Sequence, residues 1–315
     1  MRIMRRRSCL RGDVPDGSDC VCPTKTLLFK GSIIADEGIF YAAATEYGKY
    51  KKEKNQNLIG VSMKTYRIRP ITLSRVQSDK GPMTYLVHYG EKIWRPYIFW
   101  IIEGAEKNII VDTAIHADDY KLHHKGFKNL PIEHLMSFED GLFKASLSPD
   151  DIDIVIQTHL HFDHCHNTHK CKNARVLVQE EELRFARDPH PVFASMYDSH
   201  LLDTLVFETV RGHKRILPGI EVIPAPGHTP GCQAVAVDTE AGHAVISGFC
   251  STMENFFPAE NIQETVSPFA GYPVIIPGIH YNAFQAYQSI IEIKALADII
   301  LPVHEPDLMN VDTIP

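Results

Sequence analysis

Apolar and polar residues alternate along much of the chain after Met63, in short runs that predict β-strands. The stretch Met63–Ile71 alternates clearly, and later runs are rich in aromatic and β-branched residues, which suit a pleated, half-buried surface. Strands from Ile220 onward are expected to form a second sheet. The expected strands are Thr84–Tyr89, Tyr97–Glu103, Asn108–Val111, Ile152–Ile156, Ala174–Gln179, Ile220–Pro224, Gln233–Asp238, Ala244–Gly248 and a last one that starts at Ile299.

Helical patterns are fewer and lie between these strands. Ser148 followed by Pro149 is typical of a helix start. Glu180–Arg187 predicts a helix, and so does Ala283–Ala297, in which Phe284, Tyr287 and Ile291 share one face. The region from Ile115 to Leu135 has no regular period and is expected to be loop with a short helix.

Residues 1–62 differ from the rest of the chain. They carry 11 Lys/Arg against 7 Asp/Glu, a net charge of +4, whereas the whole chain has −7, so residues 63–315 carry −11. Their apolar residues follow no clean period, and Cys20 and Cys22 lack partners at zinc-ribbon spacing. We therefore expect 1–62 to be a poorly ordered extension and 63–315 to be a single functional domain.

Composition narrows the class of protein. An apolar content of 44% and a charged content of 23% are ordinary for a globular protein, and no apolar run approaches the roughly 20 residues that span a bilayer. The net charge of −11 on residues 63–315 disfavours binding to the negatively charged phosphates of nucleic acid. Seven irregularly spaced cysteines and no apolar leader favour a reducing compartment, so we expect the cytoplasm, with no membrane or nucleic acid partner. The oligomeric state stays open.

The most informative stretch is Thr158–His164, which holds three histidines and an aspartate directly after a predicted buried strand. Loops at strand ends commonly carry functional residues. Imidazole nitrogen and carboxylate oxygen suit zinc and its first-row neighbours. The spacing of His159, His161, Asp163 and His164 therefore predicts a metal site.

This His-x-His-x-Asp-His motif resembles the metal-binding signature of the metallo-β-lactamase superfamily. Three other elements occur in the order that the family shows: a strand ending in Asp112-Thr113, a glycine-bounded His228, and a late strand followed by His304. The resemblance implies an α/β fold, the four-layer αββα sandwich of that family. It also implies a hydrolase with two divalent metal ions, with zinc as the expected ion.

The resemblance assigns the ligands as well. It implies that His159, His161 and His228 hold one metal and that Asp163, His164 and His304 hold the second, with Asp112 orienting a ligand imidazole. The family usually has an aspartate bridging both ions after the strand that here precedes Gly248-Phe249-Cys250. Cys250 is the nearest side chain able to replace it, either as a metal ligand or as an inert buried cysteine.

The stretches around Glu180–Ala186 and Glu254–Phe256 are similar to the N-acyl homoserine lactonase branch of this family. The resemblance implies a small-molecule substrate and opening of a lactone ring by a hydroxide held between the metals, with Asp163 relaying a proton, as in quorum quenching. That branch also has a tyrosine that polarises the carbonyl, where this chain has Met253; Tyr197, Tyr272 and Tyr281 are candidate replacements. Hydrolysis of a cyclic amide or a thioester, or metal binding without turnover, remain as alternatives.

Overall fold

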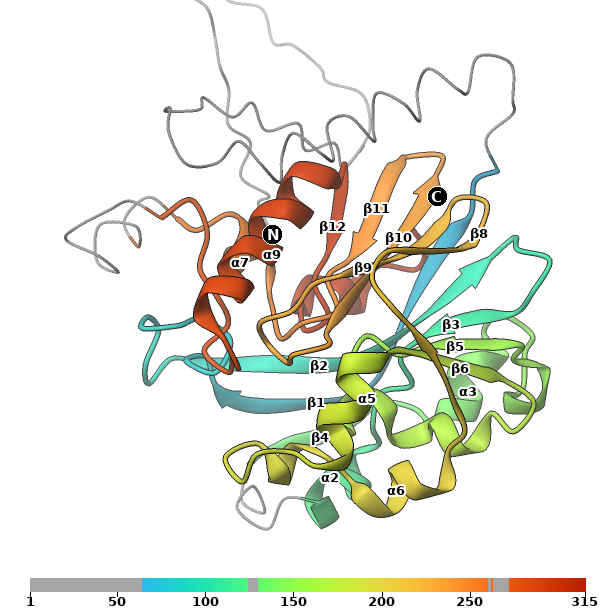
Figure 1. The fold of residues 1–315 in the computed structure, drawn as a ribbon, viewed down its shortest axis with the longest axis horizontal. Coiled ribbons are helices and arrows are strands. Elements are labelled where there is room, and N and C mark those ends of the chain that lie inside the picture. Colours follow the sequence, from blue (N-terminus) through green and yellow to red (C-terminus); the bar gives the residue numbers. More distant parts are fainter. Residues whose placement is uncertain (1–63, 124–129, 260–261, 263–271) are drawn as a thin grey trace, which may run out of the picture.

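The computed structural model describes residues 64–123, 130–259, 262 and 272–315 (Figure 1). The expected extension over 1–62, with Cys20 and Cys22, lies outside the described residues. Most of the predicted functional domain, residues 63–315, lies within them.

The described strands form two sheets. The larger has the order β4-β1-β2-β3-β5-β6-β7 and the smaller the order β12-β11-β10-β9-β8. Strands β3, β5, β6 and β7 run parallel to one another, whereas the pairs β4–β1, β1–β2 and β2–β3 are antiparallel. The strands of the larger sheet are β1 Arg67–Asp79, β2 Lys92–Glu103, β3 Ile109–Val111, β4 Ile132–His134, β5 Ile154–Ile156, β6 Arg175–Gln179 and β7 Phe207–Val210; those of the smaller are β8 Lys214–Leu217, β9 Ile220–Pro224, β10 Gln233–Thr239, β11 Gly242–Ile246 and β12 Ile299–Leu301.

Alternating side chains of each central strand enter two different cores. In β2, Trp100 packs between the two sheets with Val235 of β10, while its neighbour Phe99 packs on the outer face. Because successive side chains of a strand point to opposite faces, a strand buried on both faces becomes continuously apolar. This is why the pattern of these strands is strong in the sequence.

Helices cover both outer faces. Phe138 of α3 packs with Phe99 outside the larger sheet, and Ile290 of α9 packs with Ala234 outside the smaller one; Figure 1 shows α9 and α3 on opposite sides of the molecule. The predicted αββα sandwich is confirmed. The helices are α2 Ala117–His123, α3 Phe138–Phe143, α4 Phe162–Cys165, α5 Glu180–Arg187, α6 Ser199–Thr204, α7 Met253–Phe256 and α9 Ala283–Leu296, with 3-10 turns η2 Pro149–Asp151, η3 His166–Lys170, η4 Ala194–Met196 and η5 Pro306–Asn310.

The predicted strand Thr84–Tyr89 is wrong, because this segment is a series of turns. Leu86 and His88 have φ of 65° and 60°, in the left-handed region that a strand cannot include. The hydroxyl of Thr84 donates to the carbonyl oxygen of Val87 at 3.2 Å, which closes the turn locally. The aromatic and branched residues that suggested a strand serve a pocket instead, as described below.

Smaller differences from the predicted elements concern where strands and helices begin and which helix face is buried. The first strand begins at Arg67 rather than Met63, the start at Ser148 is a 3-10 turn, and the short strand β4 lies where only loop and helix were expected. The helix α9 buries Ile290 and Ile293, whereas Phe284 is 88% exposed, so the predicted apolar stripe is not the buried one. Among the helices of the described residues, none is both long and apolar enough to cross a bilayer.

We expect a chain that starts at Met63 to fold and to melt within a few degrees of the full chain. The described contacts begin just after Met63: Lys64 lies over the ring of Tyr66, and the N–H of Tyr66 donates to the carbonyl oxygen of Asp238 at 2.9 Å. Circular dichroism melts of the two proteins, measured side by side, test this. A truncated chain that is insoluble or melts far lower would show that residues 1–62 belong to the hydrolase domain.

Candidate metal centre

The carboxylate of Asp112 organises the loop that carries the His-rich motif. It follows β3, is fully buried, and accepts hydrogen bonds from the backbone N–H of Thr158 at 2.8 Å and from His164 Nδ1 at 2.7 Å. Because β3 and β5 are parallel neighbours, both end at the same edge of the sheet. The residues that follow them therefore meet there, as is usual at the carboxyl ends of parallel strands.

Three histidines form the first group of the centre. The ligand atoms of His159, His161 and His228 lie within 4.8 Å of one another, and all three side chains are buried. His228 lies in the turn between β9 and β10, next to Gly227 at φ +130°. A Cβ at Gly227 would lie 2.2 Å from the backbone nitrogen of Ala286, so only glycine allows the turn to pack this closely against α9.

A second group lies beside the first. It consists of Asp163, His164 and His304, whose ligand atoms also lie within 4.8 Å of one another. The rings of His159 and His164 are 4.1 Å apart between centroids, so the two groups adjoin. The structure thus brings together six of the seven predicted site residues; their role as ligands stays a prediction.

Backbone and side-chain acceptors fix the orientation of the histidine rings. The Nδ1 atom of His228 lies 2.7 Å from the carbonyl oxygen of Ile279, and that of His304 lies 2.9 Å from the carbonyl oxygen of Pro96. The Nδ1 atom of His164 likewise has a partner, the carboxylate of Asp112. A proton held on Nδ1 leaves the lone pair of Nε2 free for a metal, which is the usual arrangement of ligand histidines.

Several atoms of the centre are buried without a hydrogen-bond partner among the described residues. They are His159 Nε2, His161 Nε2 and Asp163 Oδ1. Leaving such atoms unpaired costs free energy, and divalent cations at the two groups would satisfy them. The donor set of five imidazoles and one carboxylate fits zinc and similar ions.

Electrostatics favour the ligand forms of most of these residues. Burial lowers the pKa of His159, His161 and His304 well below the usual histidine value and lowers that of His228 to about 4. Burial opposes ionisation of Asp163, but the neighbouring His164 and His304 outweigh it and lower its pKa. Neutral imidazoles and an ionised carboxylate are what a cation binds. His164 differs, since Asp163 and Asp112 outweigh its burial and raise its pKa.

Glu182 of α5 is a buried residue of this region that the sequence analysis missed. One of its oxygens accepts from the N–H of Leu160 at 2.9 Å, and the other accepts from Thr229 Oγ1 at 2.5 Å. Leu160 lies between two ligand candidates and Thr229 follows His228, so one carboxylate joins the two loops of the three-histidine group. In the sequence it is one of three consecutive glutamates, and nothing there distinguishes the buried one.

Cys250 is buried but lies outside both groups of ligand atoms in the described residues. Its sulfur is 3.2 Å from Met83 Sδ, and burial raises the pKa of its thiol to about 12. A role of Cys250 as a metal ligand stays an untested prediction.

Of the candidate tyrosines, Tyr197 is the buried one, with its ring 5.0 Å from that of His161 and its hydroxyl donating to Glu182 at 3.4 Å. Tyr272 and Tyr281 are 45% and 48% exposed. Met253 begins α7. Tyr197 is therefore the tyrosine that lies against the candidate ligands.

Comparison with known proteins identifies the family. The model of the metallo-beta-lactamase superfamily matches residues 96–295, well over half of the chain. The chain belongs to the metallo-beta-lactamase superfamily. The matched range includes all the residues of the two groups except His304, and the resemblance seen in the sequence is confirmed.

Relatives in this superfamily agree in fold and branch. The N-acyl homoserine lactonase AiiA of Bacillus thuringiensis subsp. kurstaki is 26% identical over 209 residues, covering 64% of this chain and 80% of that protein. A solved structure of a B. thuringiensis AiiA mutant with N-decanoyl-L-homoserine at its active site matches with a TM-score of 0.63 and 22% identity, covering 79% of this chain and 96% of that one. AidC, described as a dizinc quorum-quenching lactonase, matches with a TM-score of 0.56 and 16% identity over 78% of this chain and 90% of its own. This chain is thus a hydrolase with the fold of its superfamily.

We expect acid to destabilise the metal-free protein between about pH 6.5 and about pH 4. The pKa of His228 falls from 6.5 to about 4 on folding, so the unfolded chain binds more protons in this window, and stability that is present above it is lost as the pH falls. This one residue accounts for roughly 3 kcal/mol, and three more buried histidines shift in the same direction. Urea unfolding of chelator-treated protein across this range measures it.

His164 acts in the opposite sense, because its raised pKa contributes stability that is lost as the pH rises above about 6.5. One residue opposes four, so the net slope should still favour neutral pH. A free energy of unfolding that stays level from about pH 6.5 to about pH 4 would contradict the expected burial of neutral imidazoles.

Proposed function

We propose that this protein is a metal-dependent hydrolase that opens the lactone ring of N-acyl homoserine lactones or closely related cyclic esters. The observation that carries the proposal is the pair of adjoining, buried groups His159–His161–His228 and Asp163–His164–His304, in a chain whose curated relatives include N-acyl homoserine lactonases. Their activity supports ester hydrolysis here, and the quorum-quenching role is part of the proposal.

The residues of the centre suit this reaction. Divalent ions, with zinc as the expected ion at both groups, would polarise the scissile carbonyl and acidify water. Asp163 stays ionised near neutral pH and has one oxygen buried without a partner among the described residues. It can accept the proton of the attacking water and pass it to the alkoxide that leaves when the ring opens.

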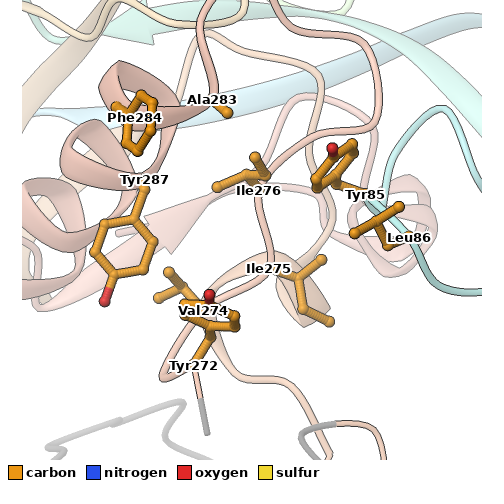
Figure 2. A pocket seen from close by; sticks show the side chains of 9 residues that line it. All are labelled: Tyr85, Leu86, Tyr272, Val274, Ile275, Ile276, Ala283, Phe284 and Tyr287. Atoms are coloured by element: carbon orange, nitrogen blue, oxygen red, sulfur yellow. The ribbon is translucent and has the colours of Figure 1, made fainter. Parts of the chain in front are cut away.

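An apolar pocket that is linked to the centre through His280 and Ile279 supports an acyl-bearing substrate. Its volume is about 530 Å³, and it is lined by the turn at Tyr85 and Leu86, by the segment Tyr272–Ile276 and by α9 (Figure 2). The ring of His280 packs against Tyr85 with centroids 4.9 Å apart, and the preceding carbonyl, of Ile279, is the one that orients His228. A tail in this pocket would extend from a ring held at the metal centre.

The expected location is the cytoplasm, and the expected partner is a small molecule alone. The cysteines Cys165, Cys171, Cys232 and Cys250 are all buried free thiols, which supports a reducing compartment. The acidic balance of residues 63–315 supports the absence of a nucleic acid partner.

Purified full-length protein should hydrolyse an N-acyl homoserine lactone, and His159→Ala and His228→Ala should each reduce the rate by at least about 100-fold, because loss of a ligand disorders the metal site. Acid release followed at constant pH measures ring opening directly. His200→Ala, at an exposed position outside the centre, is the matched control and should keep the wild-type rate.

A thioester and a cyclic amide, assayed beside the lactone, separate the alternatives. Faster turnover of either would move the proposal to that acyl bond. Metal binding without turnover of any of these three substrates would favour the alternative of a metal-binding protein without turnover.

Phe284→Glu should lower kcat/KM for a long-chain acyl lactone by about tenfold and leave a short-chain one nearly unchanged. Phe284 lines the pocket and is 88% exposed, so the substitution places a charge where an apolar tail would bind without disturbing the core. Val206→Glu is the matched control, because Val206 is 89% exposed and does not line the pocket. Equal losses for both chain lengths would contradict a tail in this pocket.

A further inference from the structure

Arg95 brings a cationic side chain to the second group of the centre. It lies in β2, directly before Pro96, whose carbonyl oxygen lies 2.9 Å from Nδ1 of His304. Its Nη2 donates to the hydroxyl of Tyr97 at 2.8 Å, and the ring of Tyr97 meets the ring of His304 edge-on at 5.9 Å. The guanidinium is thus held on the same short segment that orients a candidate ligand.

Among the described residues, no carboxylate forms a salt bridge with Arg95, and its Nε is buried without a hydrogen-bond partner. The guanidinium helps to lower the pKa of Asp163 and, after burial, that of His304. Both belong to the second group.

The second group has little negative charge with which to offset this cation. Asp163 is its only carboxylate. The segment after β11, Ser247-Gly248-Phe249-Cys250, contains no carboxylate, and Cys250 lies outside the group of ligand atoms in the described residues. A divalent ion there would have Asp163 as its one anionic ligand, with the carboxylate of Asp112 behind the ring of His164. The guanidinium of Arg95 would repel the ion, and in a buried site solvent screens such repulsion poorly.

We propose that Arg95 supplies a fixed positive charge at this end of the centre, so that the Asp163–His164–His304 group binds a divalent ion far more weakly than the three-histidine group. The inference deepens the proposed function, since it concerns the same centre. It makes the protein a hydrolase with one firmly held ion and a second that exchanges readily.

Zinc titration of the full-length, metal-free protein against a competing chelator tests the proposal without any activity assay. Wild type should bind one equivalent tightly and the second about 100-fold or more weakly. Arg95→Gln, which keeps a donor for Tyr97 but removes the charge, should tighten the second equivalent about tenfold or more. The first equivalent should change by less than about threefold.

Two controls accompany this variant. Arg95→Lys keeps the charge and should behave as wild type. Arg175→Gln makes the same chemical change at a residue whose side chain is 60% exposed and paired with Glu208, and it should also leave both equivalents unchanged.

Two equivalents of similar affinity in wild type would overturn the inference but not the metal centre. So would an Arg95→Gln protein whose second equivalent is no tighter. If Arg95→Gln does not fold by circular dichroism, the wild-type titration decides alone. A protein that binds no zinc at all would instead overturn the proposed function.

Discussion

The candidate centre depends on the buried carboxylate of Asp112. It joins the end of β3 to the start of the His-rich loop at Thr158 and orients His164. A carboxylate with no solvent contact is costly unless it is fully paired, so its partners have little freedom. That constraint sets the loop, and the loop sets the positions of four candidate ligands.

Glu182 provides the corresponding constraint on the other side. Its two oxygens reach the N–H of Leu160 and the hydroxyl of Thr229, and so tie the loop after β5 to the turn that carries His228. The three-histidine group therefore rests on two buried carboxylates that lie outside it. Such supporting contacts usually tune a metal site as much as the ligands do, and here those of Glu182 also join a loop of the larger sheet to a turn of the smaller one.

The two groups differ in their electrostatic surroundings. The three-histidine group consists of neutral imidazoles whose pKa values are lowered by burial. The other group combines one carboxylate, a histidine of raised pKa and the neighbouring cation of Arg95. Two sets of candidate ligands therefore do not imply two equivalent metal positions.

The sequence by itself determined the fold class, most of the central strands and six of the residues that come together. Strands buried on both faces produce continuous apolar runs, and the ligand motif is local, since His159 to His164 lie within one loop. The branch of the family was also visible in the sequence. By contrast, Thr84–Tyr89 had the composition of a strand and became a turn, because left-handed φ values and local hydrogen bonds are not encoded by hydrophobicity. Tertiary structure alone decided that Glu182 and not its neighbouring glutamates is buried, that Cys250 packs beside Met83, and that Arg95 lies at the second group. Each of these depends on contacts between segments far apart in the chain, and no periodicity in one segment records what packs against it.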